Sequence, residues 1–410
     1  MNFIPAALKT KTVQESVEES IGLEGPPDVR VTIGGRTYLY FAGSGYLGLQ
    51  SSPEILAAAC EAVLQYGVGT ATVRTALTSP PVFEVERRIA QMLGTERSLY
   101  TASGYSANLN LITALEGTFD RIFIDESAHY SLFDAAKRMK RNRRPVVFRH
   151  CNISDLKSKL DSELPLNERP MILTDGVFSL LGTVAPLREY IDLLSHYEGA
   201  SLCIDDAQGF GVLGTNGLGT LEHCGISPAL ANRTMQDNSD EFGLCSGDDL
   251  QMPDVKVYWA FSLSKAAGGG GGIISGTETF IQYLKDRSAV ELATSAPASP
   301  IAAATAKALP LLAAPFLRKK LQENVHFLKN RLRNIGIVMN DSPVPAAVFT
   351  LGSSQNMRRI QKELSERGIL ISYLPRYAGL GSEGALRIAV FATHSEEMLT
   401  ELTEALKKVL

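Results

Sequence analysis

The stretch "WAFSLSKAAGGGGGIISG", residues 259–276, sets one lysine, Lys265, between a hydroxyl-rich tripeptide and five consecutive glycines. The run before it, "KVYWAFS" at 256–262, and the run after it, "GGIISG" at 271–276, have the length and composition of buried β-strands. Glycine lacks the Cβ atom that restricts the backbone, so the chain can turn tightly between the two runs. The pattern predicts a lysine held at the end of a strand.

The glycines beside this lysine do not form a nucleotide-binding motif. A Walker loop places its lysine after the glycines and before Ser or Thr. Two other stretches, "GSGYLG" at 43–48 and "GFGVLG" at 209–214, satisfy GxGxxG, but neither opens a helix directly after a strand, as a dinucleotide site requires. We expect both to be turns.

Similar short apolar runs lie upstream, separated by helix-length segments. They are "RSLYTA" at 97–102, "RIFID" at 121–125, "PVVFR" at 145–149, "MILTD" at 171–175 and "SLCID" at 201–205. Together with the two runs around the lysine, they predict an α/β fold with a mainly parallel, seven-stranded sheet and helices on both faces. Functional groups are expected at the carboxyl ends of these strands.

The C-terminal part has a different pattern, which predicts a smaller α+β domain. A long helix at 302–335 is expected to be interrupted near Pro310 and Pro315, and strands and helices follow it. The polar, acidic segment 229–255 predicts a surface loop or insertion. We therefore expect an N-terminal segment that joins the small domain, a large domain and the small C-terminal domain, at 1–60, 61–290 and 291–410.

Composition narrows the class of protein. The chain has 410 residues, 45% of them hydrophobic, and a net charge of −4. This length supports two domains, and the acidic balance argues against nucleic acid or an anionic membrane as the main partner. The basic cluster at 137–144 is interpreted as a solvated helix end. No secretory signal and no membrane-spanning run is present, so we expect a cytoplasmic protein.

The cysteines give no sign of a disulfide framework or of a metal site. They stand at 60, 151, 203, 224 and 245, far apart and never in a CxxC pair. We expect reduced thiols, mostly buried, and no bound metal.

Lys265 can be catalytic if it forms a Schiff base with an aldehyde cofactor, and such a site needs a phosphate cradle and a partner for a pyridinium nitrogen. The segment "TASGYSAN" at 101–108 follows a strand and opens a helical pattern, so amides near Gly104 point at an anion. Asp205 ends a strand, where a buried carboxylate needs a cation. His129 is a planar side chain able to lie against a ring.

The order of these motifs, phosphate turn, His, "TDGVFS", "DDAQG" and then "SLSKA", resembles the α-oxoamine synthases. This is a branch of the fold-type I, class II aminotransferase-like enzymes that use pyridoxal 5'-phosphate (PLP). The resemblance extends from "YLGL" at 46–49 to "LRIAVFATH" at 386–394.

The resemblance implies roles for individual residues. Lys265 carries the cofactor and moves the Cα proton of the substrate, Asp205 holds the pyridine nitrogen, and His129 stacks on the ring. Arg387 grips the substrate carboxylate, with Ser44 nearby. The remaining cofactor-binding residues implied by the family pattern are Ser103, Gly104, Tyr105, Ser179, Gln208, Ser262, Ser264 and Thr294.

The same resemblance implies a reaction and partners. A small amino acid condenses with an acyl thioester, either acyl-CoA or acyl carrier protein, and carbon dioxide is lost to leave an α-aminoketone. Thr294 matches a threonine that reaches the phosphate of the partner subunit, so a homodimer with shared active sites is implied.

Several positions depart from the family pattern. Gln208 replaces the usual His, and an amide can donate a hydrogen bond but cannot carry a proton. Leu181 replaces an acid, Ser44 an asparagine, Val82 a histidine and Ala385 an arginine. These changes leave three interpretations open: a synthase with an unusual amino acid or acyl donor, another PLP reaction such as transamination or decarboxylation, or a silent partner subunit. We favour the synthase because Arg387 is retained.

Overall fold

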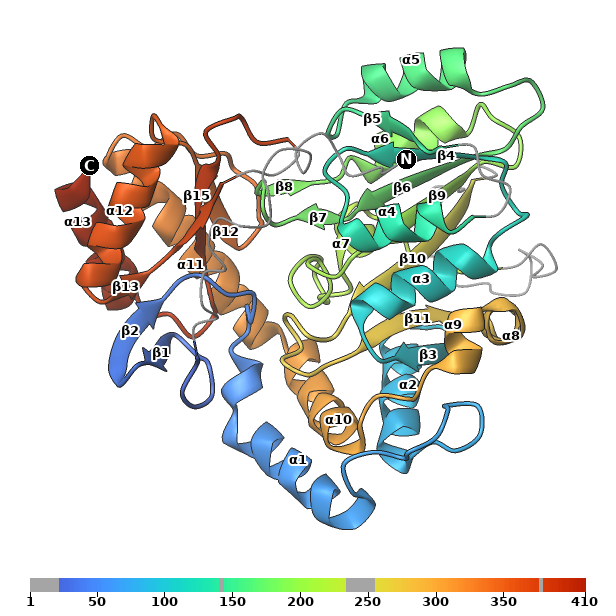
Figure 1. Ribbon diagram of the computed structural model, residues 1–410, viewed down its shortest axis with the longest axis horizontal. Coiled ribbons are helices and arrows are strands. Elements are labelled where there is room, and N and C mark those ends of the chain that lie inside the picture. The colour runs from blue at the N-terminus through green and yellow to red at the C-terminus, as the bar shows by residue number, and fades with distance from the viewer. Residues whose placement is uncertain (1–21, 140–143, 234–254, 376–378) are drawn as a thin grey trace, which may run out of the picture.

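The computed structural model describes residues 22–139, 144–233, 255–375 and 379–410. Its centre is a seven-stranded sheet in the order β3-β11-β10-β9-β6-β4-β5 (Figure 1). Strand β11 is antiparallel to both of its neighbours, and the other neighbouring pairs are parallel. The seven predicted strands all form, as β3 (Arg97–Thr101), β4 (Arg121–Asp125), β5 (Val146–Phe148), β6 (Pro170–Asp175), β9 (Ser201–Asp205), β10 (Lys256–Ser262) and β11 (Gly272–Gly276). The predicted mainly parallel α/β fold is confirmed.

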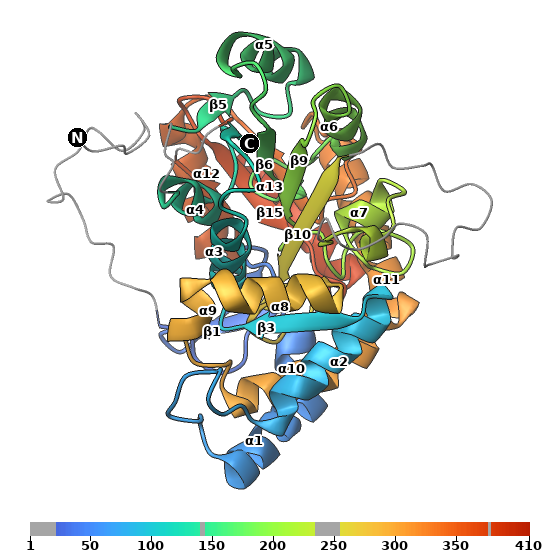
Figure 2. The ribbon, with the colours of Figure 1, turned by 90° about the vertical axis from the view of Figure 1, so that its right-hand side faces the viewer.

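Successive side chains of the sheet enter two separate cores, because neighbouring residues of a strand point to opposite faces. On β10, Tyr258 and Ala260 pack in one core, whereas Phe261 and Trp259, the single tryptophan, pack in the other. Figure 2 shows α3 and α4 on one side of β6, β9 and β10, and α6 and α7 on the other.

Both cores are closed by helices. The first is covered by α3 (Gly104–Ala114), α4 (Tyr130–Lys137) and α8 (Glu278–Arg287). The second is covered by α2 (Pro80–Leu93), α5 (Ile153–Glu163), α6 (Leu187–Leu194) and α10 (Ser299–Ala313). Shorter helical elements are α7 (Thr220–His223), α9 (Ala289–Ala293) and the 3-10 turns at Leu49–Ser51 and Pro228–Leu230.

The C-terminal part lies beside the large sheet (Figure 1). It contains a sheet in the order β12-β15-β14 and the helices that pack with it. These elements are α11 (Pro315–Asn334), β12 (Ala346–Phe349), α12 (Ser354–Glu366), β14 (Ser372–Leu374), β15 (Ala385–Ala389) and α13 (Glu396–Val409). The predicted break at Pro315 is confirmed, since this proline starts α11, where its missing N–H costs nothing. The break predicted at Pro310 is wrong, because this proline lies inside α10 and the helix continues.

The N-terminal strands pair with the C-terminal part. Strand β2 (Arg36–Tyr40) is antiparallel to β1 (Arg30–Ile33) and parallel to β13 (Ile369–Leu370). Helix α1 (Pro53–Tyr66) instead packs against α10, and it crosses residue 60, where we predicted a boundary. The division at 60 and 290 stays a proposal.

His394 ties these N-terminal and C-terminal segments together. Its ring is 1% exposed and stacks on Phe41 and Phe391, with centroid distances of 4.3 and 5.0 Å. The Phe391 N–H donates to Nδ1 (2.9 Å), and Nε2 donates to the Tyr40 carbonyl (3.0 Å). The neutral imidazole is thereby satisfied, and burial lowers its pKa to about 4.

Other predictions have mixed outcomes. Residues 43–48 and 209–214 do form turns. The expectation of mostly buried cysteines is wrong: Cys203 is buried, but Cys151 and Cys224 are partly exposed and Cys60 lies on the solvent side of α1. These four thiols are free. Cys245, most of 229–255 and part of 137–144 lie outside the described residues.

Among the described residues, no single helix has the length and apolar character needed to cross a membrane. The pair α10 and α11 meets the criteria of length and composition only when taken together, and it is bent by 71°.

Candidate functional site

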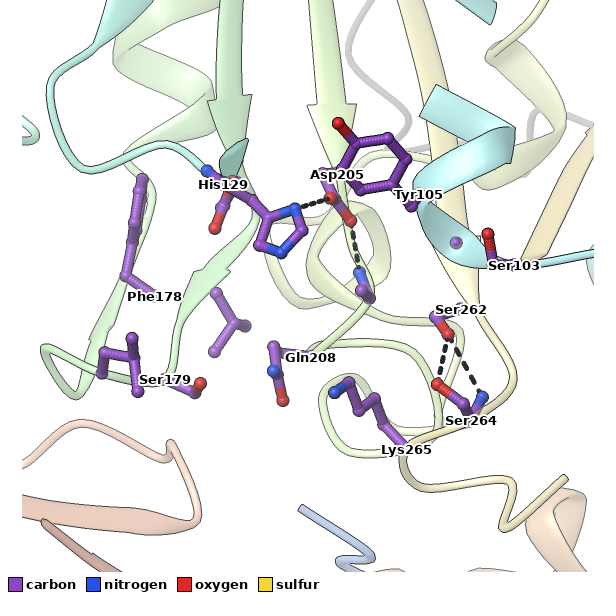
Figure 3. A pocket seen from close by; sticks show the side chains of 15 residues that line it. Ser103, Tyr105, His129, Phe178, Ser179, Asp205, Gln208, Ser262, Ser264 and Lys265 are labelled. Carbon is purple, nitrogen blue, oxygen red and sulfur yellow. Dashed lines mark hydrogen bonds and ion pairs between the residues drawn. The ribbon is translucent and has the colours of Figure 1, made fainter. Parts of the chain in front are cut away.

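A cavity of about 360 Å³ lies at the carboxyl ends of β6, β9 and β10 (Figure 3). The sheet places the last residues of these strands, Asp175, Asp205 and Ser262, side by side in its wall. Most of the predicted site residues line it, namely Ser103, Gly104, Tyr105, His129, Ser179, Asp205, Gln208, Ser262, Ser264 and Lys265. The structure therefore brings together residues that are up to about 160 positions apart in the chain.

One end of the cavity presents backbone amides and hydroxyls that can donate to an anion. Ser103 caps α3: its Oγ accepts from the Ser106 N–H (3.0 Å), and its own N–H donates to Ser106 Oγ (2.9 Å). The first amides of a helix have no partner within the helix and carry its positive partial charge. A Cβ atom at Gly104 would lie 2.8 Å from Ser262 Cβ, so only glycine fits this turn. The hydroxyls of Ser262 and Ser264, 2.8 Å apart, lie at the same end (Figure 3).

Asp205 supplies a buried carboxylate in the wall of the cavity, between His129 and Tyr105 (Figure 3). The side chain accepts from the Ala207 N–H (3.0 Å) and from Asn108 Nδ2 (2.5 Å), and His129 Nδ1 lies 3.9 Å away. Burial raises its pKa, whereas His129, the two donors and Lys265 oppose that rise. A buried carboxylate is stabilised by a cationic partner. The protonated nitrogen of a pyridine ring is such a partner.

Lys265 follows β10 and points into the same cavity (Figure 3). Burial lowers the pKa of its amine, as does the positive charge of Arg387, and Asp205 acts in the opposite direction. A lowered pKa favours the neutral amine, which attacks an aldehyde. The glycine run passes directly under the anion site: a Cβ atom on Gly272 would lie 2.4 Å from the Ser103 carbonyl oxygen.

His129 caps the N-terminus of α4 and turns a half-exposed ring to the cavity (Figure 3). The ring Nδ1 of His129 is 2.7 Å from Ser131 Oγ. The backbone N–H of His129 donates to Asp175 Oδ1 (2.9 Å). One flat face of the imidazole is therefore held in place and free to lie against an aromatic ring.

Sequence reasoning missed three polar residues of this region. Asp175 faces Asp205 across the strand pair, and burial together with that neighbour raises its pKa well above the usual range. Asn108 lies on α3 and donates to Asp205. Tyr46 is fully buried, and its hydroxyl donates to Gln208 Oε1 (2.7 Å). Asp175 ends its strand as Asp205 does, and that shared position is a signal that could have identified it.

Three predicted residues do not line the cavity. Arg387, on β15, is 4% exposed, and its Nε donates to the Ser179 carbonyl (3.1 Å) behind the wall. Ser44 lies in the loop whose neighbouring carbonyls Arg387 also reaches, at Ala42 and Gly43. Thr294 follows α9, and its hydroxyl donates to the carbonyl of its own helix at Val290 (2.8 Å).

Three further departures from the family pattern, Leu181, Val82 and Ala385, also do not line the cavity. Val82 is buried in α2 and Ala385 in β15. Neither contributes to the cavity wall, so their identity does not alter its chemistry directly.

One group of potential metal ligands lies elsewhere among the described residues: Asp125, His150 and Cys151. The carboxylate already accepts from the Cys151 N–H (2.8 Å) and contacts His150 Nδ1 (3.1 Å). The other ring nitrogen of His150 is 2.9 Å from Thr183 Oγ1. These atoms are engaged in joining β4 to the short hairpin of β7 (Val177–Phe178) and β8 (Thr183–Val184).

The residues of the cavity fit PLP. An anion site for its phosphate, a buried carboxylate for its ring nitrogen, an aromatic face and an amine for its aldehyde all face one space. Fold and site together define a PLP-dependent transferase of fold type I. The sequence profile of the aminotransferase class I and II family matches residues 38–406, and the chain belongs to this family.

Individual relatives agree with this assignment. Over 410 aligned residues the chain is 31% identical to the 8-amino-7-oxononanoate synthase of Cellvibrio japonicus, covering 99% of this chain and 95% of the relative. A serine palmitoyltransferase from S. paucimobilis with bound PLP and myriocin has a TM-score of 0.82 at 21% identity, covering 95% and 92% of the two chains. For the 8-amino-7-oxononanoate synthase of Francisella tularensis the TM-score is 0.71 at 23% identity, with 90% and 97% covered. The predicted family resemblance and PLP as cofactor are confirmed.

Proposed function

We propose that this protein is a PLP-dependent acyltransferase that joins a small amino acid to an acyl thioester with loss of carbon dioxide. The observation that carries the proposal is that Lys265, Asp205 and the anion-binding turn at Gly104 face one cavity. They do so in a chain that is similar along nearly its whole length to an 8-amino-7-oxononanoate synthase. The product would be an α-aminoketone.

The residues at the reacting centre have distinct tasks. When bound, PLP withdraws the electron pair that remains at Cα of the amino acid after its proton leaves. Asp205 keeps the proton on the ring nitrogen, which makes this withdrawal effective. Lys265 would hold the aldehyde of the cofactor, and its neutral amine would be placed to accept the Cα proton of the amino acid. His129 fixes the plane of the ring.

The amino acid needs a cation to bind its carboxylate, and the acyl chain needs an apolar surface to pack against. Arg387 is the proposed partner of the amino acid carboxylate: its contacts to carbonyls are 3.1 to 3.4 Å long, and a carboxylate forms shorter, charge-assisted bonds with a guanidinium. Val177, Phe178 and Leu180 form an apolar side of the cavity, against which an acyl chain can pack. A bond would form between Cα and the thioester carbon while the carbon–sulfur bond breaks, and the sulfur would leave as a thiol after taking up a proton. The carboxyl group would then depart as carbon dioxide, and a proton would take its place at Cα.

A second candidate is another PLP reaction at the same centre, either transamination or simple decarboxylation. It is supported by Gln208, since an amide lining the cavity cannot pass a proton as the usual His could. A silent partner subunit is disfavoured because Lys265, Asp205 and His129 are all present in one cavity.

The test separates these reactions. The PLP-loaded protein is mixed with glycine, alanine or serine, each with and without acyl-CoA or acyl carrier protein thioesters, and carbon dioxide and aminoketone are measured. Condensation releases carbon dioxide only when both substrates are present, and the Lys265→Ala variant releases none. Carbon dioxide from the amino acid alone, or conversion of PLP to its amine form, would overturn the proposal.

A homodimer with shared active sites is part of this proposal. Thr294 lies outside the cavity of its own chain, which supports a role in the site of a second subunit. Light scattering gives the mass in solution, and mixing Lys265→Ala with Thr294→Val subunits tests sharing, because a mixed dimer then retains one intact site. The cytoplasmic location stays a prediction.

A further inference from the structure

Behind the cavity wall, three side chains form a continuous hydrogen-bonded chain. Arg387 Nη2 is 3.4 Å from the Tyr46 hydroxyl, and that hydroxyl is 2.7 Å from Gln208 Oε1. Tyr46 and Arg387 are buried, and Gln208 reaches from this network into the cavity. Figure 3 shows Gln208 and Lys265 at the same end of the cavity.

The direction of each bond in this chain follows from chemistry. A guanidinium has donors only, so Arg387 must donate to the Tyr46 oxygen. Burial raises the pKa of the Tyr46 phenol, which therefore keeps its single proton. That proton is directed to Gln208 Oε1, because a carbonyl oxygen can only accept. The oxygen of the Gln208 amide is thus occupied on the side away from the cavity.

We propose that Tyr46 is a positioning residue that holds the Gln208 amide with Nε2 toward the cofactor. Position 208 then acts as a permanent hydrogen-bond donor, suited to an anionic oxygen of the cofactor ring beside the aldehyde. This inference rests on the PLP chemistry of the proposed function but not on its substrates. The proposal explains how Gln208, which cannot exchange a proton, can still donate a hydrogen bond to the ring oxygen.

The first test replaces Tyr46 by phenylalanine, which removes the hydroxyl and leaves the ring. With its orientation released, Gln208 loses part of its bond to the ring oxygen, and we expect PLP to dissociate about fivefold more readily. The pH midpoint of the visible band of the PLP-loaded protein should rise, because a ring oxygen without its donor holds the neighbouring proton more tightly. Tyr100→Phe is the matched control: this buried hydroxyl donates to the Gly270 carbonyl (2.7 Å), and its loss should leave the midpoint unchanged.

The second test asks whether Tyr46 acts through Gln208. If it does, the Tyr46→Phe and Gln208→Leu double variant has the midpoint and PLP affinity of Gln208→Leu alone. Midpoint shifts that add as independent effects would overturn the proposal, and so would a Tyr46→Phe protein that matches wild type.

A third variant needs no change at Tyr46, in case that substitution disturbs folding. In Gln208→Glu the Tyr46 hydroxyl still has an acceptor, but no N–H faces the cofactor. The proposal expects PLP affinity to fall at least as far as in Gln208→Leu. Wild-type PLP affinity in both Gln208→Leu and Gln208→Glu would overturn the proposal, because position 208 would then give the cofactor no hydrogen bond. None of these measurements depends on which substrates the enzyme uses.

Discussion

Acid should destabilise this fold through one buried histidine, His394. In the folded chain its pKa is about 4, against an ordinary value of 6.5. As pH falls below the ordinary value, the unfolded chain takes up a proton that the folded chain excludes, so stability is retained above that pH and lost below it. One pKa unit corresponds to about 1.4 kcal/mol. Between about pH 7 and about pH 5 the free energy of unfolding should therefore fall by about 2 kcal/mol through this residue.

The measurement is urea unfolding followed by circular dichroism at both pH values, for wild type and His394→Gln. Glutamine keeps a donor for the Tyr40 carbonyl but does not titrate. The pH-dependent loss should be about 2 kcal/mol smaller in the variant, whatever its stability at neutral pH. His326→Gln, at an exposed histidine of α11, controls for replacing a histidine by glutamine. An equal pH-dependent loss in wild type and His394→Gln would refute this reasoning.

Three predictions concern the site. Lys265→Ala should abolish the visible absorption of the PLP-loaded protein and its borohydride-trapped adduct, since the amine that binds the aldehyde is gone. Asp205→Asn should lower the condensation rate about 100-fold or more, because an amide cannot keep the ring nitrogen protonated; steady-state kinetics measure this. Asn108 is left unchanged in this variant. Gly104→Ala should weaken PLP binding by about tenfold in a dialysis assay, because the added Cβ atom meets Ser262 at 2.8 Å. Unchanged affinity there would argue against the phosphate turn.

Local patterns were sufficient to predict the large sheet. Each of its strands is a short apolar run, and strand ends in such a sheet gather at one edge. Asp205 and Lys265 could thus be predicted to meet although sixty positions separate them. The same reasoning applied to "MILTD" identifies Asp175, whose last-residue position was the available signal.

Contacts made by a distant loop could not be predicted in this way. Tyr46 reaches Gln208 across 162 positions, and nothing in "GSGYLGL" indicates that its hydroxyl points to the loop after β9. Pro310 was misjudged because a proline within a helical pattern usually breaks it, whereas the buried alanine-rich face of α10 keeps this helix continuous. The place of Arg387 behind the wall depends on the packing of two parts of the chain that are far apart in sequence.

Trp259 gives the molecule a built-in optical probe. It is the only tryptophan, it is buried in β10, and six positions separate it from Lys265. PLP bound at that lysine would absorb the energy emitted by an indole so near in the chain, and no second tryptophan contributes to the signal. Quenching of the tryptophan fluorescence would therefore report the fraction of chains that carry PLP, even in preparations that show no activity.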